Sequence, residues 1–294
     1  MANLKEIRTR LNSIKSTKQI TSAMKMVAAS KLRKAQDKIL RLKPYAGKLQ
    51  EILRGISARI EEADNEYSYS RISDPKKILL IVITSNRGLC GAFNSNVIKE
   101  TTRILKEKYP QQSGTGNVDL ITIGKKGADF FRKSKYKVVE DYSPVFDDLQ
   151  FETVNVIAES VMDNFLKGKY DRVEFIYNQF KNAAVQILTN EQFLPVENDA
   201  DEDESEALTD YIYEPGKEEI IKELIPKTLK VQFYRNVLDS YVAEHGARMT
   251  AMHMATDNAT ELIRDLTLDY NKARQASITS QILEVVSGAE ALNG

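Results

Sequence analysis

The segment 85–94 holds most of the side chains whose types and spacing could do chemistry. It reads SNRGLCGAFN and lies between a run of apolar, β-branched residues and an amphipathic stretch, where a glycine loop can cradle a phosphate. Its glycines fit neither the G-x-x-x-x-G-K-S/T spacing nor the G-x-G-x-x-G spacing, and the GKKG at 124–127 is a weaker match. We therefore expect a tight structural turn in preference to a nucleotide site, and no bound cofactor.

The two histidines, the single cysteine of the segment 85–94 and the acidic run 197–206 form no reactive set. His245 and His253, the only histidines, are eight residues apart, which on a helix is about 12 Å along the axis and too far for one metal ion. Cys90, the only cysteine, has no histidine beside it in sequence and excludes an internal disulfide. The seven carboxylates of 197–206 lack the glycine and glutamate positions of a calcium loop. We expect core or interface histidines, a solvated acidic loop, no metal and no catalytic residues.

Charge is unevenly distributed along a chain whose net charge is zero. Residues 1–54 hold 14 Lys and Arg against 3 acidic residues, whereas 197–206 is entirely acidic among its charged residues. This distribution indicates partners of opposite charge. Nucleic acid is the less favoured partner, because the basic residues surround a helix that also carries an apolar seam and only Tyr45 is interleaved with them.

The middle of the chain predicts a small α/β domain with a mainly parallel sheet. The run 77–84, KILLIVIT, is typical of a strand buried on both faces. Strands and helices then alternate, with a polar linker expected at 110–117. The other predicted strands are 118–123, 136–140, 171–178 and 183–188, and the predicted helices are 92–109, capped by Asn94 or Ser95, 125–134 and 152–167.

The two ends of the chain predict long helices that pair with each other. Steps of three and four residues pick out one apolar seam in each end, and a seam of this kind requires a second helix to cover it. A return helix begins within 217–224, and Pro226 is expected as the first residue of the long rod. The C-terminal seam is Leu238, Val242, His245, Met249, Met252, Thr256, Ala259, Ile263, Leu266, Tyr270, Ala273 and Ser277. The N-terminal seam is Leu4, Ile7, Leu11, Ile14, Ala28, Leu32, Ala35, Ile39, Leu42, Ala46, Leu49, Leu53, Ile56 and Ile60.

The predicted fold is therefore an α/β central domain plus a long antiparallel two-helix coiled coil. Its parts are an N-terminal helix over 1–62, an α/β domain over 75–195, an acidic loop over 196–215 and a C-terminal helix over 216–294. Because the C-terminal helix is the longer one, its end should project with little cover, and some other protein should surround it.

The N-terminal seam fails in the middle, which leaves two interpretations open. Lys18, Thr21 and Lys25 occupy seam positions, while Ile20, Met24 and Val27 form an offset stripe. The stripe is either a stutter, where a straight helix drifts off a 3.5-residue repeat, or a face turned to an outside partner.

Three blocks of sequence resemble the gamma subunit of the F-type ATP synthase. They are 4–36 (LKEIRTRLNSIKSTKQITSAMKMVAASKLRKAQ), 84–94 (TSNRGLCGAFN) and 249–292 (MTAMHMATDNATELIRDLTLDYNKARQASITSQILEVVSGAEAL). The resemblance implies a non-catalytic rotor shaft inside three alpha and three beta subunits. It also implies an epsilon subunit against the α/β domain and a membrane c-ring below it, so that the shaft couples proton or sodium flow to ATP synthesis or hydrolysis.

The resemblance also implies contact residues. Those facing the alpha/beta ring are Met24, Lys25, Met26, Arg87, Arg274, Gln275, Ile278, Ile282, Val285 and Val286, and those near the c-ring or epsilon subunit are Tyr211, Tyr213 and Glu214. Departures from the family pattern are Gln281, where many members carry an acidic residue, and Ala92, in place of a second glycine.

The start of the chain has no apolar signal core and no transit peptide, which favours the cytoplasmic side of a bacterial membrane, peripheral to it. The competing classes of function are a stand-alone coiled-coil scaffold or nucleic-acid binder and a nucleotide-binding α/β enzyme.

Overall fold

A computed structural model describes residues 4–57, 69, 71, 74–134, 136–196 and 217–293. Two compact units divide the chain: residues 1–28 with 249–294, and residues 29–248. Each unit thus holds a piece of both terminal helices. The elements in chain order are α1 (Leu4–Ser57), β1 (Ile78–Ile83), α2 (Phe93–Glu107), α3 (Pro110–Gly114), β2 (Val118–Ile123), α4 (Lys125–Lys133), β3 (Lys137–Asp141), η2 (Ser143–Phe146), α5 (Phe151–Leu166), β4 (Arg172–Phe180), β5 (Gln186–Leu194) and α6 (Lys217–Asn293).

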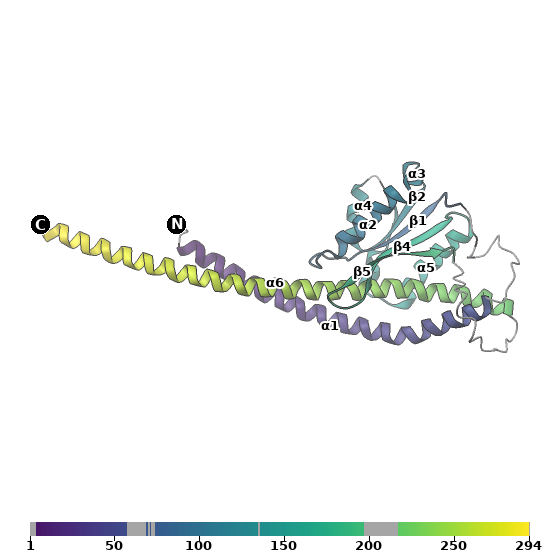
Figure 1. Ribbon diagram of the computed structural model, residues 1–294, viewed down its shortest axis with the longest axis horizontal. Coiled ribbons are helices and arrows are strands. Elements are labelled where there is room, and N and C mark those ends of the chain that lie inside the picture. Colours follow the sequence, from purple (N-terminus) through teal and green to yellow (C-terminus); the bar gives the residue numbers. More distant parts are fainter. Residues whose placement is uncertain are drawn as a thin grey trace. The chain divides into compact units, whose positions relative to one another are not determined.

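The larger unit is built on a five-stranded sheet in the order β3-β2-β1-β4-β5 (Figure 1). Strands β3, β2, β1 and β4 run parallel to one another, and β5 is antiparallel to β4. All six residues of β1, the central strand, are buried, as the uninterrupted apolar run predicts. The α/β domain and its mainly parallel sheet are confirmed.

Alternate residues of β1 face two separate cores. Ile78, Leu80 and Val82 pack with side chains of α2 and α4 on one face of the sheet. The other residues of β1 pack with α5 and with α6, whose Phe233 ring centroid lies 4.9 Å from that of Phe175 in β4. The first part of α6 therefore belongs to the core of the α/β domain and is one of the layers that cover its sheet.

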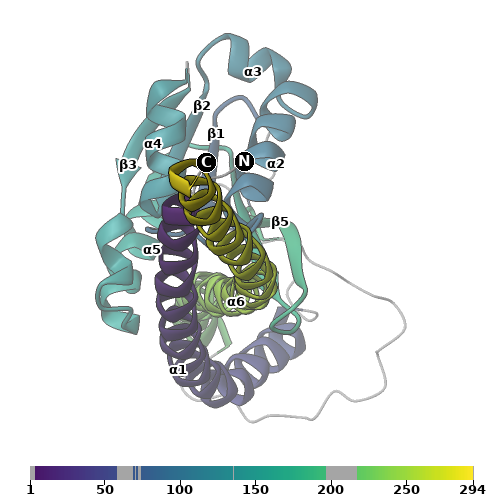
Figure 2. The same ribbon diagram turned by 90° about the vertical axis from the view of Figure 1, so that its left-hand side faces the viewer.

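The terminal helices run antiparallel in both units. In the larger unit, Lys31 acts electrostatically on Glu244, and Leu42, further along α1, lies in a groove with Tyr234, which is earlier in α6. In the smaller unit, the hydroxyls of Thr21 and Thr256 lie 2.8 Å apart, and both views show the two helices side by side (Figures 1 and 2). The predicted two-helix pair is confirmed.

The seams predicted from the sequence are the faces that this pairing covers. From Leu238 to Ala273, every residue of the C-terminal seam is buried or half-buried, and Ser277 is exposed. On α1, the seam residues Leu4 to Leu49 are likewise buried or half-buried. Of the later seam positions, Leu53 and Ile56 lie in a part of α1 whose side chains are not described, and Ile60 falls outside the described residues.

Several local predictions are wrong. The segment 110–117 is a short helix followed by a turn, because Pro110 with its fixed φ starts α3 at its first turn. The last strand begins at Gln186, three residues later than expected, and runs to Leu194. Pro226 does not begin a helix, since α6 is continuous from Lys217 and contains it.

The predicted cap of α2 is also wrong. Neither Asn94 nor Ser95 caps this helix, whose N-cap is Ala92. The amide oxygen of Asn94 accepts a hydrogen bond from the backbone N–H of Ser85, 2.9 Å away, and the hydroxyl of Ser95 donates to the carbonyl of Ala92. Asn94 therefore stabilises the preceding turn.

Candidate coupling surfaces

The stripe on α1 lies on the outside of the helix pair. Ile20, Met26 and Val27 are 60%, 64% and 58% exposed, whereas Lys18, Thr21 and Lys25 are half-buried in the seam. The seam therefore continues through its polar positions, and the interpretation of the apolar stripe as a stutter in the core is wrong for Ile20 and Val27. Of the predicted contact residues here, Met24 and Lys25 are half-buried and Met26 is exposed.

The end of α6 has no cover from the described part of the chain. Thr256 lies beside Thr21, so Ala273, 17 residues later, corresponds in an antiparallel pair to Leu4, 17 residues before Thr21. Ala273 is the last half-buried residue of α6 among those whose burial is described, and every residue from Arg274 to Glu290 is exposed. Figure 1 shows α6 continuing past the beginning of α1.

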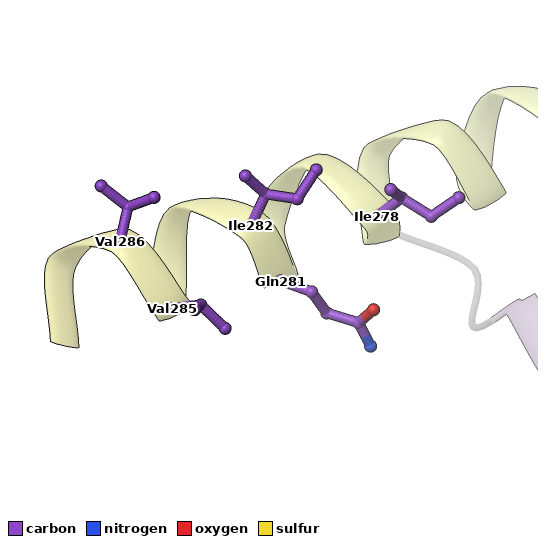
Figure 3. Close-up of a pocket in the computed structure, with 5 residues that line it drawn as sticks. All are labelled: Ile278, Gln281, Ile282, Val285 and Val286. Atoms are coloured by element: carbon purple, nitrogen blue, oxygen red, sulfur yellow. The ribbon is translucent and has the colours of Figure 1, made fainter. Parts of the chain in front are cut away.

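This uncovered end carries a run of apolar side chains. Ile282 and Val285 are 58% and 72% exposed. Figure 3 shows Ile282 and Val286 on one side of the helix and Gln281 and Val285 on the other, and all four line one pocket with Ile278. The apolar side chains therefore form a broad stripe along one face of the helix. Water contact with so much branched apolar surface is unfavourable by about 25 cal/mol per Å². The predicted contact residues of α6 all lie in this segment and are all exposed. They are Arg274, Gln275, Ile278, Ile282, Val285 and Val286.

The predicted contact residue Arg87 lies in the other compact unit, on the glycine turn after β1. Its side chain is exposed, while its backbone carbonyl accepts hydrogen bonds from the Ser85 hydroxyl (2.6 Å) and from the Arg248 guanidinium (2.9 Å). Leu89, with a positive φ of 64°, is 63% exposed beside it. The turn thus presents Arg87 and Leu89 to solvent from a fixed backbone.

The N–H groups of the GKKG segment, which a phosphate would need as donors, are already used in hydrogen bonds to this turn. The backbone N–H groups of Lys125, Lys126 and Gly127, at the start of α4, donate to Asn86 Oδ1, Ser85 O and Thr84 Oγ1. The first turn of α4 therefore binds the β1 turn. Gly124 is needed for this approach, because a Cβ there would lie 2.1 Å from the carbonyl oxygen of Thr84. In the part of the chain that is described, no group of three or more metal-ligating side chains is found.

A buried polar cluster on α6 was missed by sequence reasoning. Glu244 and Arg248 are 6% and 8% exposed and form an ion pair one helical turn apart. Burial raises the pKa of Glu244, against the opposing charges of Arg248 and Lys31. The only sequence signal is the i,i+4 spacing of Glu and Arg, which is common on exposed helix faces. Their burial depends on the contact with the turn at Arg87, which the sequence does not reveal.

The two histidines differ in environment. His245 is 4% exposed within this cluster, and burial, with the charges of Arg248 and Lys31, lowers its pKa to about 3. His253 is exposed, with Nδ1 3.3 Å from Asp257. His245 is thus a core residue, which is one of the two environments, core or interface, expected for the histidines. Cys90 is buried, with Asn94 Nδ2 3.2 Å from its Sγ, and burial raises the pKa of its thiol.

The remaining predicted contact residues, Tyr211, Tyr213 and Glu214, lie outside the described residues, as does the acidic run 197–206. Among the described helices, none combines the length and the apolar composition that crossing a membrane requires.

Taken together, these features define a class of protein in which an α/β domain is inserted between two terminal helices that pair with each other, the longer of which ends in an uncovered apolar segment. The family model described as ATP synthase matches residues 3–292. The ATP synthase gamma chain of Flavobacterium johnsoniae is 57% identical over the full length of both chains, and that of Cytophaga hutchinsonii is 52% identical, also over both full lengths. The chain belongs to the ATP synthase gamma-chain family.

Solved structures agree with this assignment. A chain of the central stalk/c-ring structure of the Tetrahymena thermophila mitochondrial ATP synthase is 25% identical, with a TM-score of 0.56, covering 80% of this chain and 99% of that one. A chain of the Euglena gracilis mitochondrial ATP synthase structure, which includes OSCP, F1 and the c-ring, is 23% identical, with a TM-score of 0.68 and coverage of 98% and 94%. The second likeness is one of fold.

Proposed function

We propose that this chain is the central rotor shaft of an F-type ATP synthase, non-catalytic in itself, which couples ion flow through a membrane c-ring to ATP synthesis or hydrolysis at alpha/beta sites. The observation that carries the proposal is the exposure of every residue from Arg274 to Glu290, including branched apolar side chains. A segment of this kind requires a surrounding protein. Three alpha and three beta subunits around the shaft would supply it.

The proposed contacts use the exposed groups on both terminal helices. Met24, Lys25 and Met26 would face the beta-subunit levers, Arg274 and Gln275 would hold a beta-subunit loop, and the apolar end of α6 would turn in a hydrophobic bearing. The basic surplus of α1 favours acidic levers, and water and salt weaken such contacts enough for them to slide.

The proposed mechanism follows from asymmetry. A single two-helix shaft inside a ring of threefold pseudo-symmetry presents a different face to each beta subunit, so three chemically identical sites are held in different states. Rotation exchanges these states in turn. Because coupling of binding free energies is reciprocal, nucleotide binding pushes on the shaft as the shaft alters nucleotide affinity.

The proposed role also assigns domain boundaries, binding partners and a cellular location to the chain. The divisions are 1–62 and 216–294 as the shaft helices, 75–195 as the α/β domain and 196–215 as an acidic loop. The epsilon subunit would bind the α/β domain, with Tyr211, Tyr213 and Glu214 near the c-ring. The chain would be peripheral, on the cytoplasmic side of a bacterial plasma membrane, and would bind no nucleic acid.

Reconstitution with matching alpha and beta subunits tests this proposal. A coupling subunit should assemble as one copy per ring and raise the ATPase activity of the subunits. An unrelated scaffold would leave the activity unchanged. ATP hydrolysis by the purified chain alone would contradict its non-catalytic role.

A further inference from the structure

A groove lies where α1 passes α5 and α6 in the larger compact unit. It measures about 550 Å³ and is separate from every contact residue predicted above. Three elements contribute its walls, so it is a feature of the folded unit and of no single helix. Its lining residues are Lys38, Arg41, Leu42, Tyr45, Gln150, Phe151 and Tyr234.

The rim of the groove is cationic. Lys38 and Arg41 are both exposed, and no carboxylate lines the groove. The Lys38 ammonium donates to the carbonyl oxygen of Leu149 over 2.9 Å, which holds it at the rim and leaves its other hydrogens free for an anion. Within the described part of the chain, Arg41 has neither an ion pair nor a hydrogen bond to another residue.

Two carboxylates lie near the groove without lining it. Asp148 lies close in sequence, and its Oδ2 accepts a hydrogen bond from Gln150 over 2.7 Å. Glu152 acts on the Tyr234 phenol, whose pKa is raised by burial and then by this charge. Helix α5 begins at Phe151 without a side-chain cap, and Glu152 in its first turn offsets the positive end of its dipole.

The floor of the groove is apolar and aromatic. Phe151 and Tyr234 pack edge to face with ring centroids 5.5 Å apart, and Leu42 is half-buried beside them. Tyr45 is 45% exposed. The combination of cations above an aromatic floor fits a segment that offers carboxylates together with a large apolar side chain.

We propose that this groove docks an acidic segment of a partner polypeptide, which inserts one aromatic or aliphatic side chain against Leu42, Phe151 and Tyr234. Its carboxylates pair with Lys38 and Arg41. The charge complementarity selects an acidic polypeptide over a basic or neutral one. The inference does not depend on the rotor function, because the groove belongs to the chain by itself.

The test uses the full 294-residue chain and a fluorescent six-residue peptide with two acidic residues on each side of a Leu-Phe pair. We expect saturable binding, weakened by salt, and an at least tenfold loss with Arg41→Glu. Arg33→Glu is the matched control, since it makes the same charge change on α1 at a residue outside the groove, and it should reduce affinity less than threefold. Absence of binding, or equal losses in the two variants, would overturn the proposal.

Two further arms identify what the groove recognises. Peptides with amides in place of the carboxylates, or with Ser-Ser in place of Leu-Phe, should each lose at least tenfold in affinity, and retention by either peptide contradicts the corresponding half of the site. A variant with all seven carboxylates of 197–206 changed to amides should bind the peptide as the parent chain does. A tenfold gain in that variant would mean that the chain's own acidic run occupies the groove, which overturns the proposal of an outside partner.

Discussion

The Arg248 guanidinium on α6 donates to the carbonyl oxygen of Arg87 over 2.9 Å and to that of Gly88 over 3.3 Å. The same guanidinium pairs with the buried carboxylate of Glu244. One side chain thus joins the C-terminal helix to the turn that follows the central strand. The exposed side chain of Arg87 depends on this joint for its position.

We expect Arg248→Ala to lower the free energy of unfolding by about 3 to 5 kcal/mol, because it leaves the carboxylate of Glu244 buried without its partner. The double variant Glu244→Gln, Arg248→Met should lose less, since no buried charge remains. Urea unfolding measures both. Arg103, in an exposed pair with Glu100, is the control, and its replacement by Ala should change stability little. Equal losses in the single and double variants would contradict the importance of the unpaired charge.

Asp239 should make stability depend on pH. Burial raises its pKa to about 6, although the Phe180 N–H and the charge of Arg235 favour the ionised form. The folded chain therefore holds this proton at pH values where the unfolded chain, with a pKa of 3.8, has lost it. The stability from this group is present below about pH 4 and is lost as the pH rises through about 6.

Asp239→Asn is therefore expected to stabilise the protein at pH 7 by about 1 to 3 kcal/mol, with little difference at pH 4. The amide oxygen can still accept from Phe180. Thermal unfolding at the two pH values measures the effect, with Asp129→Asn at an exposed position of α4 as the control. A gain that is the same at both pH values would show that the charge is not its cause.

Gly124→Ala should be severely destabilising, by more than about 3 kcal/mol, because φ is 119° and the new Cβ would overlap the Thr84 carbonyl. Gly114→Ala is the matched control, since no atom lies within 4 Å of its Cβ position, and it should be neutral or slightly stabilising. Chemical denaturation of both variants measures the change in the free energy of unfolding. A mild effect at Gly124 would mean that the turn and α4 can move apart at low cost.

Met24→Lys should impair coupling more than assembly, because it places a charge on the half-buried edge of the stripe that the proposed function turns toward the beta subunits. The measurement is the number of protons pumped per ATP hydrolysed by the reconstituted complex. Met254→Lys makes the same change at an exposed position of α6 outside the predicted contacts, and should have a smaller effect. An unchanged ratio with Met24→Lys would argue against its role.

Periodicity in the sequence was sufficient to predict the two terminal helices, their seams and the buried central strand. These features follow from the spacing of apolar side chains, which repeats every three or four residues in a paired helix and runs unbroken in a strand covered on both faces. The end of α6 was also foreseen as uncovered, since the two helices differ in length. The cap of α2 was not predicted correctly. The side chain of Asn94 accepts a hydrogen bond from the Ser85 N–H, and the conformation of the turn brings these two groups together.

Only the tertiary structure decided where polar side chains lie. Glu244 and Arg248 have the spacing of an ordinary surface pair, yet they are buried, because the turn at Arg87 packs on that face of α6. The groove between α1, α5 and α6 likewise joins residues more than a hundred positions apart. The spacing of apolar residues along the sequence predicts which faces of a helix or strand are buried. This spacing does not predict which distant segment covers those faces, because that depends on tertiary packing between elements that are far apart in the sequence.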